Sequence, residues 1–179
     1  MTAIRRAYDR FLEIIAVILM VAVTGIITLG FVYRWFNASL VWYDEIASIS
    51  LCWLTYYAGA LAALRGAHIG FAGFVNSLSP SLRVAATAFA SLVTIFFFVV
   101  LGIMGAQVVQ ILKGDTLVSI PWLSLQVTQS VIPIASALFV IAELLRLPEV
   151  LREAKKGPLV DHELQEALAH GQASKEIRS

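Results

Sequence analysis

The fold is decided by residues 33–68, which read YRWFNASLVWYDEIASISLCWLTYYAGALAALRGAH. A short polar bend follows residues 33–37 (YRWFN), and an almost uncharged segment begins after residues 42–45 (WYDE). Tryptophan and tyrosine combine an apolar ring with a polar edge, and both are enriched where a membrane meets water. The stretch therefore predicts a transmembrane hairpin whose bend lies at the membrane surface.

The composition of the whole chain also indicates a location in lipid. Of its 179 residues, 59% are hydrophobic and 14% are charged, whereas a soluble domain is about 45–50% apolar and about 25% charged. The net charge of +1 comes without any basic block, so nothing indicates a nucleic acid partner. Cys52 is the only cysteine, which excludes an intrachain disulfide and paired-cysteine redox chemistry.

Four uncharged runs are long enough to cross a bilayer, because about 20 helical residues span its hydrocarbon core of about 30 Å. We predict an all-α integral membrane protein with a four-helix membrane domain over residues 1–147 and a polar cytoplasmic tail over residues 148–179. The predicted spans are residues 12–33, 44–64, 84–112 and 121–145. Pro121 is predicted to start the fourth span, and Pro133 to kink it, because proline cannot donate to the carbonyl one turn earlier.

Lysine and arginine are divided unequally between the two predicted sides of the membrane. The positive-inside rule places the richer side, and with it both termini, in the cytoplasm. Residues 66–83, between the second and third spans, are apolar with near-helical spacing, which predicts a segment lying in the cytoplasmic interface. The richer side holds Arg5, Arg6, Arg10, Arg65, Arg83, Arg146, Arg152, Lys155 and Lys156, and the other side holds Arg34 and Lys113.

Asp44 and Glu45 are the acidic residues at the outward bend. They follow Trp42 at the interface, and not at mid-membrane, where a charge costs at least about 2.5–3.5 kcal/mol. Three roles are open for them: a favourable charge at the start of a helix, a contact with another subunit, or ion coupling. Arg34 lies across the bend, and an ion pair with either acid would pin the hairpin.

The predicted spans carry no ionisable residue at mid-membrane, which argues against a proton-coupled carrier that works alone. His68, at the end of the second span, is typical of a capping or packing residue, and the three histidines lack metal-binding spacing. No nucleophile–base grouping points to an enzyme. The sequence therefore predicts neither a cofactor nor a metal.

Small residues recur one helical turn apart in two of the spans. Gly59 and Ala63 share one face of the second span, and Gly102 and Ala106 share one face of the third. Small side chains at this spacing let another helix approach closely.

Several short motifs follow one another in the order and spacing of a known family. They are Arg34-Trp35-Phe36-Asn37, Ser39-Leu40 with Trp42 and Glu45, Trp53, Gly59-Ala60, Arg65-Gly66-Ala67-His68-Ile69, Leu78 with Pro80 and Arg83, and Ser119-Ile120-Pro121-Trp122. Over residues 10–147 the chain resembles the small membrane subunit of TRAP transporters, the DctQ family. It departs from that family at Gly70 and Ala72, where a basic and an acidic residue are common, which bears on charged contacts of the cytoplasmic loop.

The resemblance implies an accessory subunit of a tripartite secondary transporter in the bacterial inner membrane. Such a subunit supports a large permease, which holds the substrate and sodium sites, while a periplasmic binding protein delivers an organic acid such as a C4-dicarboxylate. The small-residue faces would pack against the partner, and the outward loops would help to receive the binding protein. The candidate interface or hairpin-pinning residues are Arg34, Trp42, Asp44, Glu45, Gly59, Ala63, His68, Gly102, Ala106 and Trp122.

Two other functions remain open for these residues. A stand-alone small transporter that forms homo-oligomers would use the polar cluster of Gln126 and Gln129 near Pro133 as its path. A membrane scaffold or assembly protein would not transport at all. Neighbouring genes for a large permease and a secreted binding protein would favour the tripartite transporter over both.

Overall fold

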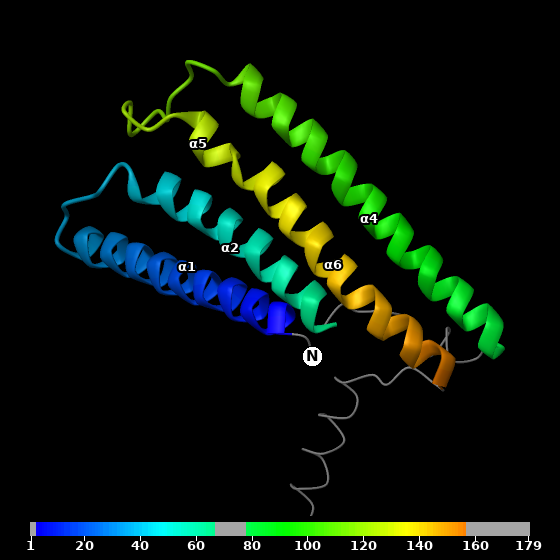
Figure 1. Cartoon of the computed structure of the whole chain (residues 1–179). Coiled ribbons are helices and arrows are strands. Elements are labelled where there is room, and N and C mark those ends of the chain that lie inside the picture. The colour runs from blue at the N-terminus through cyan, green and yellow to red at the C-terminus, as the bar shows by residue number, and fades with distance from the viewer. Residues whose placement is uncertain (1–2, 67–77, 157–179) are drawn as a thin grey trace, which may run out of the picture.

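A computed structural model describes residues 3–66 and 78–156 of the chain. Apart from one isolated bridge, the regular structure of these residues is helical. Four helical segments are long and apolar enough to cross a membrane: α1, α2, α4, and α5 together with α6. This result confirms the predicted four-span, all-helical fold. The helices are α1 (Ala3–Trp35), α2 (Tyr43–Arg65), α4 (Pro80–Ile111), α5 (Leu125–Gln129) and α6 (Val131–Lys156) (Figure 1).

The fourth span differs from its prediction. Pro121 lies in the preceding loop, and the first helix of the span, α5, begins after it. The span is interrupted at Ser130, and Pro133 falls in the first turn of α6, where a missing N–H costs little. The predicted kink is therefore a break between two helices. α6 also continues through Pro148, beyond the predicted domain boundary at residue 147.

Three predicted features fall outside the described residues. The predicted interfacial segment lies largely on residues 67–77, and the predicted tail lies largely on residues 157–179. His68 belongs to the first of these two ranges. All three stay predictions.

The spans lie side by side in the order α1, α2, α6, α4 (Figure 1). α2 packs against both α1 and α6, and α6 packs against both α2 and α4. The last span of the chain therefore stands between two earlier ones, and it is the most buried of the four.

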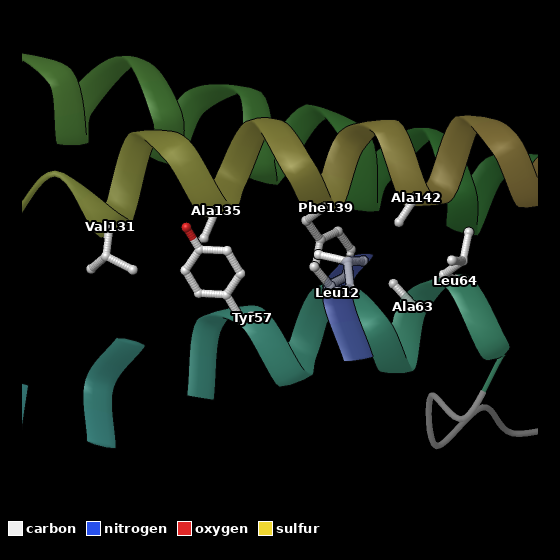
Figure 2. Packing of buried hydrophobic residues seen from close by; sticks show 9 residues of the cluster. Leu12, Tyr57, Ala63, Leu64, Val131, Ala135, Phe139 and Ala142 are labelled. Carbon is white, nitrogen blue, oxygen red and sulfur yellow. The ribbon is translucent and has the colours of Figure 1, made fainter. Parts of the chain in front are cut away.

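The core lies between α2 and α6, with one residue of α1 closing its side (Figure 2). Lipid is as apolar as these side chains, so the close fit of the helices holds the bundle together more than removal from water does. Phe139 of α6 extends this fit to α4, because its ring stacks on that of Phe98 with centroids 3.6 Å apart. The core residues are Leu12, Tyr57, Ala60, Ala63, Leu64, Val131, Ala135, Phe139 and Ala142.

Polar side chains tie α1 to its neighbours at the end of the bundle that carries the N-terminus. Arg65 of α2 donates to both carboxylate oxygens of Asp9, at 2.8 and 2.9 Å. Its Nη2 also lies 3.1 Å from the carboxylate of Glu13. The Tyr8 hydroxyl donates to the carbonyl of Leu138 in α6 at 2.6 Å. These contacts fix the tilt of α1 against both α2 and α6.

The end of α2 is closed by a glycine and by an arginine from α1. Gly66 adopts a φ of 77°, and its N–H caps the last turn of the helix. A Cβ at this position would lie 2.8 Å from Nη2 of Arg146, so both the conformation and the contact favour glycine. Arg5 donates to the Leu64 carbonyl at 3.0 Å and pairs with Glu149 of α6. The structure therefore explains why residue 66 of the Arg65-Gly66 motif is glycine.

The break in the fourth span is covered by Trp53 of α2. Its indole N–H donates to the carbonyl of Thr128 in α5 at 2.9 Å. Trp53→Phe keeps an aromatic ring but removes this donor, so we expect the free energy of unfolding to fall by about 0.5–1.5 kcal/mol. SDS titration of the purified protein in mixed micelles measures this change. The control is Trp122→Phe, because Trp122 is 83% exposed; an equal loss in both variants would contradict the prediction.

Candidate functional site

Two loops stand at the end of the bundle opposite to the N-terminus (Figure 1). Residues 36–42 join α1 to α2, and residues 112–124 join α4 to α5. They are the two loops that the sequence predicts to face outward. Both expose large apolar side chains, among them Val41 at 81%, Val118 at 93% and Trp122 at 83%.

Glu45 joins these two loops. It lies in the first turn of α2, next to the α1–α2 loop. Its carboxylate accepts the backbone N–H of Val118 at 3.3 Å and that of Ser119 at 3.0 Å. The hydroxyl of Ser119 donates to the same carboxylate. One side chain of α2 thus binds three donors of a loop that follows it by more than 70 residues.

The α4–α5 loop has an ordered shape of its own. The N–H of Leu117 donates to the Leu123 carbonyl and the N–H of Leu125 to the Asp115 carbonyl, both at 3.0 Å. The Leu117 side chain is buried. These bonds shape the loop, and Glu45 sets where it lies on the bundle.

Gln126 also binds the backbone near this loop. Its side-chain amide donates to the carbonyl of Val109 at 2.9 Å. This carbonyl belongs to the last turn of α4, where carbonyls lack a partner within the helix. The Ser130 hydroxyl likewise donates to the Val127 carbonyl at 2.7 Å. Two polar groups near Pro133 therefore satisfy the backbone around a helix end and a helix break.

Close packing of a side chain of α2 on the backbone of α1 holds the two helices together near the bend. A Cβ on Gly30 would lie 2.3 Å from Cδ2 of Tyr43, so the tyrosine ring packs directly on the α1 backbone. Among the described residues, Arg34 and Asp44 take part in no ion pair, and both are exposed. The predicted ion pair between Arg34 and an acid of the bend is therefore not formed. Trp42, 37% exposed, stands at the N-terminal cap position of α2.

The four small residues predicted to meet a partner helix lie in different surroundings. Ala63 is fully buried in the core of the chain itself. A Cβ on Gly102 would lie 3.3 Å from Cβ of Ser136, so Gly102 faces α6 of the same chain. Ala106 is half-buried. Gly59 has open space, because a Cβ there would meet no atom within 4 Å.

Gly59 lines a groove of about 390 Å³ that lies over α6. The remaining lining comes from α2, α4 and α6 and is mostly aromatic, including the stacked pair of Phe98 and Phe139. The lining residues are Thr55, Tyr56, Gly59, Phe97, Phe98, Leu101 and Phe139.

The structure makes two residues prominent whose contacts the sequence did not predict. Gly105 is the buried glycine of α4, and a Cβ there would lie 2.6 Å from Cγ2 of Ile132. Its three-residue spacing from Gly102 was a signal that the sequence offered. Ser119 was noted only as part of a family motif, and its contact with Glu45 gave no local signal, because the two residues are 74 positions apart.

The chain is thus a multi-pass membrane protein, and the hydrogen bonds described above join its helices and loops to one another. No three histidine, cysteine, aspartate or glutamate side chains gather in residues 3–66 and 78–156 as they would around a metal ion. The sequence model of the DctQ component of tripartite ATP-independent periplasmic transporters matches residues 23–153. The chain therefore belongs to the DctQ family and is a small subunit of a TRAP transporter, which confirms the resemblance seen in its motifs. A comparison with curated proteins finds no match.

Proposed function

We propose that this subunit supports the large permease of its transporter and helps a periplasmic binding protein to dock, for sodium-driven uptake of an organic acid. Membership of the DctQ family is the observation that carries the proposal. Hydrogen bonds between the helices of the bundle support the proposal. Glu143, buried in α6, accepts a hydrogen bond from Ser91 of α4 at 2.8 Å, and Trp53 binds a carbonyl of α5. These groups hold helices together, as a supporting subunit requires.

The orientation follows from the arginine and lysine count. Both termini face the cytoplasm, and the loops at residues 36–42 and 112–124 face the periplasm across the inner membrane. The exposed apolar side chains of these loops, Val118 and Trp122 among them, form the surface that receives the binding protein. Large exposed apolar groups commonly mark such contacts.

The groove beside Gly59 is the part of the bundle that we assign to the large permease. Its open space suits a side chain of a neighbouring helix, since small residues let helices approach closely. Ala63 and Gly102 take no part, because they contact helices of this chain.

Reconstitution into proteoliposomes tests the proposed function. With a sodium gradient and radiolabelled C4-dicarboxylates, keto acids and sugar acids, we expect uptake of at least one acid only when the subunit, the large permease and the binding protein are all present. The isolated subunit should give no flux above empty liposomes. Robust flux from the isolated subunit would overturn the proposal in favour of a stand-alone transporter.

A pull-down of the tagged chain from its native membrane gives an independent check. We expect a large polytopic permease near one-to-one with the subunit. Recovery of the chain alone, associated only with itself, would contradict the accessory role.

A further inference from the structure

Three hydrogen-bond donors of one loop converge on a single carboxylate from another part of the chain. They are the consecutive N–H groups of Val118 and Ser119 and the hydroxyl of Ser119, all bound by Glu45. Hydrogen bonds to an ionised acceptor are shorter and stronger than bonds between neutral groups. The carboxylate offers two oxygens to these donors, whereas the amide of a glutamine would offer one oxygen and two competing donors.

The loop that Glu45 binds carries the most exposed large apolar side chain of the described residues. Val118, whose N–H is bound, has a side chain that is 93% exposed, and Trp122 at the far side of the loop is 83% exposed. The bonds of Leu117 and Leu125 within the loop preserve its shape but do not attach it to α2. Glu45 provides that attachment, so it determines where Val118 and Trp122 stand relative to the α1–α2 loop.

We infer that Glu45 is a positioning residue: it holds the two outward loops as one surface in the geometry to which the periplasmic binding protein docks. This inference rests on the proposed function and adds to it the residue that arranges the docking surface. It also gives the two neighbouring acids, Asp44 and Glu45, different roles. Asp44 is exposed and forms no ion pair in the described part of the chain, so it carries the same charge without holding the loop.

The docking test uses the complex of subunit and large permease in nanodiscs, titrated with the fluorescently labelled binding protein of the same transport system. We expect Glu45→Gln to raise the Kd several-fold and Ser119→Ala to raise it less, because Ser119→Ala keeps both backbone bonds. Asp44→Asn is the matched control, with the same loss of charge one residue away, and should leave the Kd unchanged. The ratio of subunit to permease should stay the same in all variants. An equal rise in Asp44→Asn and Glu45→Gln would overturn positioning in favour of a general charge effect.

Amide hydrogen exchange on the same complexes tests the attachment itself. In Glu45→Gln we expect faster exchange at Val118 and Ser119, and unchanged exchange at Leu117 and Leu125, whose bonds lie within the loop. Unchanged exchange at Val118 and Ser119 would overturn the attachment. Faster exchange with an unchanged Kd would overturn its role in docking. A wild-type complex that binds no binding protein would instead overturn the proposed function.

Discussion

Replacing Gly105 with leucine is expected to force α4 away from α6 and to lower the free energy of unfolding by about 1–3 kcal/mol. A Cβ at this position would lie 2.6 Å from Cγ2 and 3.1 Å from Cβ of Ile132, and 3.3 Å from Cδ of Pro133. The proline ring is rigid, and Ile132 is branched at Cβ, so neither can move aside by a simple rotation. α6 is the main partner of α4, so the damage falls on the contact that holds α4 in the bundle.

Gly25→Leu is the matched control for this change. A Cβ on Gly25 would meet no atom within 4 Å, so the same substitution in α1 should have little effect. SDS titration in mixed micelles compares the two variants with the wild type. Equal stability of the Gly105 and Gly25 variants would show that α4 and α6 do not approach as closely as the structure has them.

Phe139→Ala is expected to destabilise the bundle by about 1–3 kcal/mol through the cavity that it leaves. The Phe139 ring is 5% exposed and stacks on Phe98 at an angle of 11° between ring planes. In a soluble core this substitution costs about 3–5 kcal/mol. In lipid the transfer part of that cost largely disappears, and the lost contacts remain.

Phe96→Ala controls for the loss of an aromatic ring as such. Phe96 is 68% exposed on α4, so in the membrane lipid would fill the space that its ring leaves. Thermal unfolding in detergent should show a clear drop of the Tm for Phe139→Ala and almost none for Phe96→Ala. A similar drop in both would indicate that general hydrophobicity, and not packing at Phe139, stabilises the bundle.

Hydropathy predicted the number of spans because each run of about 20 uncharged residues has one stable state in lipid, a helix with all its backbone groups bonded. The start of the fourth span was harder to predict from the sequence. Pro121 is typical of a helix start, but the loop before α5 satisfies its backbone through Asp115, Leu117 and Leu123 instead. Such bonds within a loop leave no periodic pattern in the sequence.

The candidate site was predictable in part for a similar reason. The position of Glu45 beside Trp42 marked it as an interfacial acid, but its contact with Ser119 depends on how α2 and α4–α5 come together. Small-residue spacing also pointed to the correct helix, α4, without selecting the residues that touch α6. Gly102 and Gly105 face α6, whereas the sequence pattern favoured Gly102 with Ala106.

The place of α6 between α2 and α4 has a consequence for how the protein is made. Synthesis runs from the N-terminus, so α4 enters the bilayer before its main packing partner exists. Until residues 131–156 arrive, the α1–α2 hairpin can pack, but α4 lacks the helix against which it mainly packs in the complete bundle. Insertion of the final span therefore closes the bundle in one late step, and a polypeptide that stops short of α6 has three membrane crossings but lacks four of the nine core residues.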